Sequence, residues 1–330
     1  MNLTFRLRGS ICLASCIALF GWASSASALV VALSNDDGWD APGVQAMLSA
    51  LEAAGHTVTL AGPLDEQSGS SAAINAVSNL VITKQSPNEY SVAIAGGTEG
   101  AEPATSALIA IGIAKDANGG VAPDLLVSGI NAGANIGAAT QLSGTVGGAI
   151  VSLANGLNGS VPAIAISTDE PCDEDDPPGG DLPACVAANA VHYANVAGFV
   201  TDFIAHLETK PGFLNSTSGL LPQGVGLNIN YPPLPPEDIQ GVSLNRQGRL
   251  LVIDGTPLAL DVVCFACAFI PVGASSPGGI GAAGFDPTPD VADSDATAFA
   301  DGFISVVPIE PDYTARNRRD FESVVSSFRN

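Results

Sequence analysis

Two adjacent carboxylates, Asp36 and Asp37, come shortly after an apolar run at residues 29–33 and precede Gly38. Neighbouring carboxylates repel each other unless a cation lies between them, and hard divalent cations prefer oxygen ligands. Open α/β sheets bind ligands at the C-terminal ends of their strands, which is where these acids stand if residues 29–33 form a strand. The pair therefore predicts a metal site, although Asp-Gly is also common in ordinary turns.

Polar residues also follow two other predicted strands. Ser68 comes after the strand expected at residues 57–61, and Asn131 comes after the strand expected at residues 124–128. In a doubly wound sheet these loops and the Asp36 loop converge on one edge. Two carboxylates and two neutral oxygens suit Mg²⁺ or Mn²⁺, with water completing the coordination shell. Taken alone, Ser68 and Asn131 each also fit an ordinary turn residue.

A third polar stretch, Ser143-Gly144-Thr145, opens a helix that we expect at residues 144–155. The free backbone N–H groups at a helix start can receive an anion. The same residues also fit plain helix capping, with glycine allowing close packing. The sequence holds no Gly-x-Ser-x-Gly elbow, phosphate-binding P-loop or Gly-x-Gly-x-x-Gly fingerprint, so hydrolysis by a serine triad and dinucleotide chemistry are both disfavoured.

These residues need a rigid framework to bring them together, and the alternation of apolar runs with helical patterns predicts one. It is typical of a parallel sheet covered by helices on both faces. We predict a Rossmann-like, doubly wound, mostly parallel α/β fold, with a less regular C-terminal extension. The expected strands and helices follow from the residue types within each segment and from the Gly and Pro residues that mark the ends of the segments. The further strands are expected at residues 163–167, 224–230 and 303–307, and the further helices at 42–54, 104–115 and 192–207.

Local signals refine this division of the chain. Asp40 is expected to cap the first helix and Gly55 to end it. Residues 169–183 are acidic and rich in Pro and Gly, which predicts a solvated loop, and residues 275–292 are expected to be irregular. We expect one domain at residues 29–330, with its core at about 30–230 and the extension at 231–330.

The N-terminus resembles a secretory signal peptide. Arg6 and Arg8 precede an apolar segment at residues 11–22, and Ala26-Ser27-Ala28 fits a cleavage site. The mature protein would then begin near Leu29 and be periplasmic or secreted. A membrane anchor is the weaker alternative because the apolar segment is short, and lipidation at Cys16 is disfavoured because the apolar run continues past it.

The composition narrows the classes of partner. The formal net charge is −22, and 46% of the residues are hydrophobic against 13% charged. Such a chain can bury a large core, but it repels nucleic-acid backbones and anionic membranes. A small phosphate ester stays compatible with this charge if a bound cation offsets the local field. The acids Asp286, Asp290, Asp293 and Asp295 lack the EF-hand pattern and are expected in a solvated loop.

Four cysteines would remain after cleavage. Cys172 and Cys185 flank the acidic loop, and in an oxidising compartment their position suggests a disulfide. Cys264 and Cys267 could pair with each other. They have half of a zinc-binding spacing, but there is no second Cys-x-x-Cys and there are only 3 histidines, so zinc is disfavoured.

Taken in order, these blocks resemble the SurE family of metal-dependent 5'/3'-nucleotidases. The resemblance rests on Ser34-Asn35-Asp36-Asp37-Gly38, Gln67-Ser68-Gly69, residues 127–135, Ser143-Gly144-Thr145-Val146-Gly147, residues 227–232 and residues 301–308. It implies a Rossmann-like core that hydrolyses phosphate from nucleoside monophosphates with one divalent cation, Mg²⁺ or Mn²⁺. It also implies a homodimer or homotetramer.

The resemblance also implies roles for individual residues. It places the metal on Asp36, Asp37, Ser68 and Asn131, with the two aspartates as the catalytic residues, and it places the phosphate near Asn35, Asn135, Ser143, Gly144 and Thr145. One block departs from the family pattern: Gly-Thr-Pro-Ala-Asp-Cys reads Gly-Thr-Glu-Gly-Ala-Glu-Pro-Ala at residues 97–104. This departure keeps open an alternative, an exported protein that binds metal or nucleotide without turnover.

Overall fold

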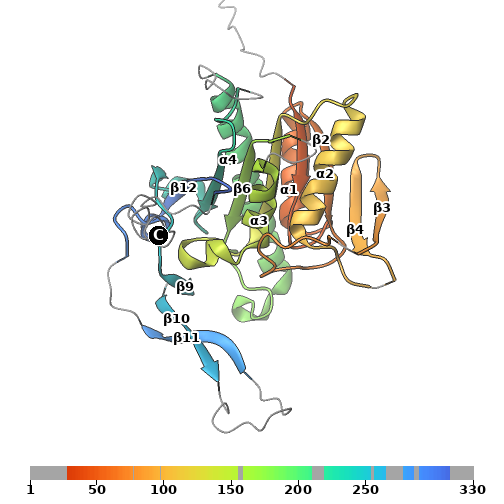
Figure 1. Ribbon diagram of the computed structural model, residues 1–330. Coiled ribbons are helices and arrows are strands. Elements are labelled where there is room, and N and C mark those ends of the chain that lie inside the picture. The colour runs from red at the N-terminus through yellow and green to blue at the C-terminus, as the bar shows by residue number, and fades with distance from the viewer. Residues whose placement is uncertain are drawn as a thin grey trace, which may run out of the picture.

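The protein folds around one large twisted sheet with helices on both faces (Figure 1). In this computed structural model the described residues are 28–76, 78–96, 98–154, 159–209, 219–253, 256–264, 278–285 and 290–312. The strands are β1 (Val30–Ser34), β2 (Thr57–Pro63), β3 (Leu80–Ser86), β4 (Glu89–Ile94), β5 (Leu125–Ala132), β6 (Ala163–Thr168), β7 (Gly226–Tyr231), β8 (Gly241–Leu244), β9 (Leu251–Ile253), β10 (Thr256–Cys264), β11 (Gly278–Phe285) and β12 (Phe303–Ile309). The helices are α1 (Pro42–Ala53), α2 (Pro103–Ala117), α3 (Gly144–Leu153), α4 (Leu182–Glu208) and α5 (Asp295–Ala300).

The main sheet has nine strands in the order β3-β4-β2-β1-β5-β6-β7-β12-β8. Strands β4, β2, β1, β5, β6 and β7 run parallel, while β3 pairs antiparallel with β4 and β12 antiparallel with β7. The predicted doubly wound, mostly parallel α/β fold is thus confirmed. A smaller sheet of β9, β10 and β11 stands apart from it.

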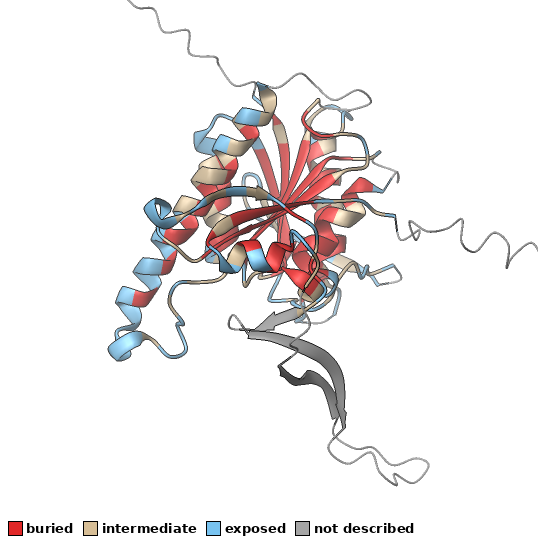
Figure 2. Cartoon of the chain, turned by 90° about the vertical axis from the view of Figure 1, so that its left-hand side faces the viewer, coloured by how far each residue is buried: buried red, intermediate tan, exposed pale blue. Residues whose placement is uncertain are grey.

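Side-chain alternation along the central strands separates two apolar cores. On one face Leu33 of β1 belongs to a cluster with Met47 of α1 and Val200 of α4. On the other face Ala32 belongs to a cluster with Ile111 of α2 and the start of β6. Figure 2 shows most of the length of these central strands as buried. Burying a side chain such as Leu33 stabilises the fold by about 2 kcal/mol, so the sheet is a rigid support for the loops at its edge.

Several local predictions need correction. Asp40 does not cap α1: the N-cap is Ala41 without a side-chain hydrogen bond, and Pro42 in the first turn starts the helix. Helix α4 begins at Leu182, earlier than expected, because Pro183 lies in its first turn and Asp181 caps it through a hydrogen bond from the Ala184 N–H. The region expected to be irregular at residues 275–292 includes strand β11.

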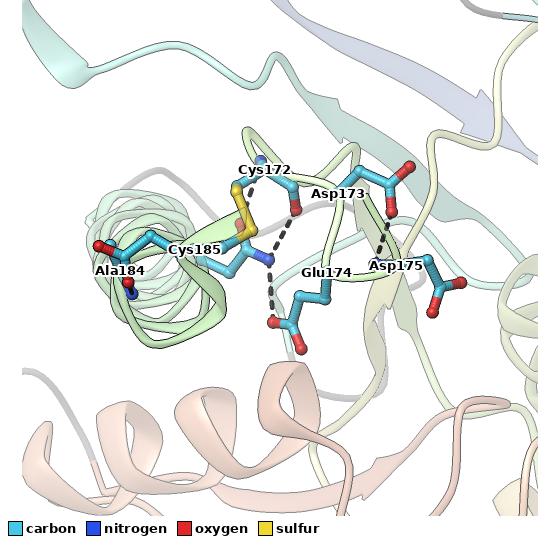
Figure 3. The surroundings of a disulfide bond; sticks show 8 residues. Cys172, Asp173, Glu174, Asp175, Ala184 and Cys185 are labelled. Atoms are coloured by element: carbon cyan, nitrogen blue, oxygen red, sulfur yellow. Dashed lines mark hydrogen bonds between the residues drawn. A yellow bond between two sulfur atoms is a disulfide. The ribbon is translucent and has the colours of Figure 1, made fainter. Parts of the chain in front are cut away.

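The acidic loop before α4 is tied to that helix by a disulfide between Cys172 and Cys185, as the sequence suggested (Figure 3). The Cα atoms of the two cysteines are 5.4 Å apart. The buried side chain of Asn189 reinforces the link, because its Nδ2 donates to the Cys172 carbonyl at 2.9 Å and its Oδ1 accepts from the Cys172 N–H at 3.2 Å. Cys267, and with it the Cys264–Cys267 pairing, lies outside the described residues.

Candidate metal and phosphate site

A tight turn after β1 carries the two adjacent carboxylates. Asn35 stabilises the turn by donating from Nδ2 to the Gly38 carbonyl at 2.7 Å. Gly38 has a φ of +116°, a conformation that glycine adopts without steric cost. Asp36 is 2% exposed, whereas Asp37 is partly open to solvent. The local sequence thus holds one acid inside the protein and its neighbour at the surface of the sheet edge.

Two other loops meet this turn, which confirms the predicted convergence at one edge of the sheet. The N–H of Gln67 donates to the Asp36 carbonyl at 2.8 Å, so the residue before Ser68 is fixed beside the acids. The N–H of Ala132 donates to Oδ2 of Asp37 at 3.1 Å, directly after Asn131. Ser68 is exposed and Asn131 is buried at the end of β5.

The electrostatics of the acid pair favour a bound cation. Burial raises the pKa of Asp36, and burial together with repulsion from Asp36 raises the pKa of Asp37 well above its usual value. Glu66 and Glu170 add further negative potential at Asp37. A divalent cation would relieve this repulsion, so the charge distribution fits a metal.

The neutral part of the site fits as well. Asn131 donates from Nδ2 to the Gly133 carbonyl at 2.6 Å, which leaves its Oδ1 buried and without a hydrogen-bond partner in the described structure. A buried acceptor without a partner is unfavourable unless something binds it, and a cation would. Among the described residues no three His, Cys, Asp or Glu side chains cluster as a metal site, so any ion here depends on two carboxylates and neutral oxygens.

The start of α3 lies directly against Asp36. The Thr145 hydroxyl donates a short hydrogen bond to Oδ1 of Asp36, which fixes the orientation of that carboxylate. A Cβ on Gly144 would stand 2.8 Å from Oδ2 of Asp36, so a side chain there would collide with the acid. Ser143 caps the helix by accepting from the Val146 N–H at 3.1 Å. The capping interpretation of this block is therefore correct, and it places the positive end of the α3 helix dipole beside the acid pair.

Asn135 belongs to a buried network that sequence reasoning missed. Its N–H donates to Oδ1 of Asn230 at 2.7 Å, its carbonyl accepts from Nδ2 of Asn228 at 2.9 Å, and its Nδ2 donates to the Ser167 hydroxyl at 2.8 Å. The alternation Asn228-Ile229-Asn230 was the available signal, because it puts two amides on one face of a buried strand. These contacts hold Asn135 firmly, and its contact with phosphate stays a prediction.

A second missed contact lies beyond β6. The Tyr193 hydroxyl of α4 donates to Oε1 of Glu170 at 2.8 Å, and burial followed by this hydrogen bond raises the pKa of Tyr193. Burial also raises the pKa of Glu170. Nothing in the local sequence around Glu170 indicated this pairing, because Tyr193 comes from a separate helix.

The strand order and the acidic loops at the carboxyl edge are those of a Rossmann-like α/β protein with a ligand site at its sheet edge. The sequence model of the family described as survival protein SurE matches residues 31–253. The chain belongs to the SurE family.

Characterised relatives and a solved structure agree with this assignment. The chain is 29% identical to "5'-nucleotidase SurE 1" of Burkholderia lata over 287 residues, covering 85% of this chain and 90% of that protein. It is 33% identical to "5'-nucleotidase SurE" of Rubrobacter xylanophilus, covering 66% of this chain and 72% of the relative. The SurE protein from Aquifex aeolicus has the same fold, with a TM-score of 0.64 and 24% identity over 91% of this chain and 99% of that one.

Proposed function

We propose that the protein is a divalent-metal-dependent phosphomonoesterase that hydrolyses nucleoside monophosphates to nucleoside and phosphate, a 5'-nucleotidase. Membership of the SurE family supports the reaction class, because several relatives carry the name 5'-nucleotidase. The observation that carries the proposal is the convergence of Asp36, Asp37 and the unpartnered Oδ1 of Asn131 beside the N-terminus of α3. This arrangement supports a cation and a phosphate group side by side.

Asp36, Asp37, Ser68 and Asn131 would hold one Mg²⁺ or Mn²⁺. When bound, such an ion polarises a phosphoryl oxygen and lowers the pKa of a water molecule. Thr145 keeps the Asp36 carboxylate in a fixed orientation through its hydroxyl. One of the two aspartates takes the proton from the attacking water, and that proton passes to the leaving alkoxide as the ester P–O bond breaks.

The start of α3 would hold the phosphate. The first turn of α3 carries the positive end of the helix dipole, which favours an anion. Ser143 uses its oxygen as an acceptor for the Val146 N–H, so its hydroxyl proton stays free to donate to a phosphate oxygen. Donors fixed in this way stabilise the charge that grows on the phosphate during the reaction.

A metal-dependence series tests the reaction and substrate classes together. Metal-stripped protein would be assayed with Mg²⁺ and Mn²⁺ against several nucleoside monophosphates and p-nitrophenyl phosphate. We expect phosphate release that requires metal and stops with EDTA. No release from AMP with Mn²⁺, or release that EDTA leaves unchanged, would reject the proposal. Calorimetric nucleotide binding without hydrolysis would instead support the non-catalytic alternative, which the altered block at residues 98–104 favours.

We also propose that the protein works outside the cytoplasm. The Cys172–Cys185 disulfide supports this, because disulfides persist mainly in oxidising compartments. No helix within the described ranges is long and apolar enough to span a membrane. Fractionation of cells producing the full-length chain should place the shortened protein outside the cytoplasm, and an uncleaved cytoplasmic product would contradict the proposal.

A further inference from the structure

A cavity of about 1040 Å³ lies along α3 and adjoins the site described above at Ser143. Its polar wall includes Asn245, Arg246 and Arg249, and its apolar wall includes Ile150 of α3 and Val307 of β12. The volume is at the upper end of the range for small-molecule sites, and the lining has the usual mixture of apolar surface and a few polar groups. The cavity is therefore large enough for a nucleoside.

Two independent observations point to a ligand. Asn245 is 8% exposed, and its Oδ1 has no hydrogen-bond partner among the described atoms, which leaves a buried acceptor at the cavity wall. The chain has 11 Lys and Arg residues, and of the four in the part that the structure describes, Arg246 and Arg249 both line this cavity. In a chain with a net charge of −22, this grouping makes two guanidinium groups available to a ligand in the cavity.

The polar wall is held rigidly, as a binding site requires. The carboxylate of Asp295 is fully buried and accepts from the N–H groups of Gly137 and Gly248, at 3.1 Å and 2.8 Å. The Asp295 N–H donates in turn to the Arg246 carbonyl at 2.9 Å. The sequence context of Asp295 suggested a solvated loop. That prediction is wrong, because the residue is buried. It joins the segment that carries both arginines to the loop before α3.

The cavity meets the proposed phosphate site at Ser143. Along α3 the cavity is lined by Ser143, Val146, Gly147 and Ile150, whereas Gly144 and Thr145 face Asp36 from another side of the first turn. A mononucleotide with its phosphate at the helix start could therefore extend around Ser143 into the cavity. Its nucleoside would lie against the apolar wall.

The charges select the class of occupant. Glu310 and Asp312 also line the cavity, so its lining holds two arginines and two carboxylates and has little net charge. That balance suits a neutral, flat, hydrogen-bonding group better than a second phosphate. Guanidinium groups stack on aromatic planes, and Oδ1 of Asn245 needs an N–H or O–H donor, which a base or a ribose supplies.

We infer that this cavity is the nucleoside subsite of the proposed nucleotidase, and that Arg246 and Asn245 determine its preference for nucleotides over simpler phosphate esters. The inference rests on the proposed function. Arg246 is exposed, and its hydrogen bonds with Asp293 and Asp295 use only backbone atoms, so replacing its side chain should not disturb the fold.

The test compares AMP with p-nitrophenyl phosphate for the wild type, Arg246→Ala and the control Lys84→Ala. Lys84 is an exposed cation on the outermost strand β3, far along the sheet order from β12. For Arg246→Ala we expect kcat/KM for AMP to fall by about tenfold or more, mainly through KM, while the value for p-nitrophenyl phosphate changes by less than about threefold. Lys84→Ala should match the wild type with both substrates. An equal fall in kcat/KM for both substrates in Arg246→Ala, or no fall in kcat/KM for AMP, would overturn the inference.

A binding measurement separates this inference from the proposed function. If the wild type hydrolyses neither ester, calorimetry with adenosine still tests whether the cavity binds a nucleoside, because adenosine carries no phosphate. Adenosine binding that weakens by about tenfold in Arg246→Ala supports the subsite. No adenosine binding by the wild type, or equal binding by the variant, overturns it.

Discussion

The hydroxyl of Thr145 donates a hydrogen bond to Oδ1 of Asp36, and this contact joins the start of α3 to the acid pair after β1. The two residues lie 109 positions apart in the chain. The contact places the helix N-terminus, which favours anions, beside carboxylates that favour cations. A metal and the phosphate that it activates can therefore occupy adjoining positions.

Thr145→Val should keep the shape of the side chain but remove the hydrogen bond to Asp36. Loss of a partner that orients a metal ligand typically costs about 10- to 100-fold in metal affinity or activity. We expect a loss of this size in kcat/KM for AMP, with recovery in Thr145→Ser, which restores a hydroxyl. Steady-state kinetics at saturating Mn²⁺ measure both variants. Equal activity of Thr145→Val and the wild type would show that the contact has no role in catalysis.

Asp37→Asn should make the metal-free protein more stable while abolishing its response to metal. Removing one charge of the repelling pair should raise the unfolding free energy, because repulsion from Asp36 disfavours the charged form of Asp37 in the folded protein. Thermal melts with and without Mn²⁺ measure both effects. A metal-induced increase in Tm as large as that of the wild type would remove Asp37 from the ligand set.

The raised pKa values also predict the pH dependence of stability. Because the pKa of Asp37 is raised above its usual 3.8 in the folded state, the folded protein binds more protons than the unfolded chain between the two values. The stability of metal-free protein should therefore fall as the pH rises above about 3.8, up to the raised pKa. Saturating Mn²⁺ should reverse this slope, because a metal competes with protons for the carboxylates. Urea titrations at several pH values, with and without metal, measure the sign of the slope of unfolding free energy against pH.

Asn131→Ala should weaken Mn²⁺ binding by about tenfold, a loss typical of disturbing a metal site. The effect on folding should be small, because Oδ1 of Asn131 has no protein partner and only the bond from Nδ2 to Gly133 is lost. Calorimetry gives the affinity and a thermal melt serves as the folding control. Unchanged affinity for Mn²⁺ would place the ion away from β5.

The Cys172–Cys185 disulfide should stabilise the acidic loop. A crosslink that closes a loop of similar size is worth about 3 kcal/mol by restricting the unfolded chain, and the two cysteines are 13 positions apart. The double variant Cys172→Ala/Cys185→Ala should therefore have a lower Tm than the wild type. Reductant should destabilise the wild type and leave this variant unchanged. A further decrease of the variant's Tm in reductant would point to another disulfide.

Local sequence patterns predicted much of the fold because the central strands are short, mostly apolar runs bounded by polar loops. The sequence pattern alone therefore predicts Asp36, Asp37, Ser68 and Asn131 at one edge of the sheet. Contacts between distant segments could not be found in the same way. Strand β3 is mostly exposed although it begins with Leu80-Val81-Ile82, and Asp295 is buried although its local sequence is polar, because Gly137 and Gly248 enclose it.

The central claim is that the acid pair holds one catalytic divalent cation. The most direct test titrates metal-stripped protein with Mn²⁺ while free Mn²⁺ is followed by electron paramagnetic resonance and phosphate release from AMP is measured in the same samples. We predict one tightly bound Mn²⁺ per chain, phosphate release that rises in proportion to the bound fraction, and loss of both in Asp37→Asn. Full activity of the stripped protein, or equal Mn²⁺ binding by the variant, would contradict the claim.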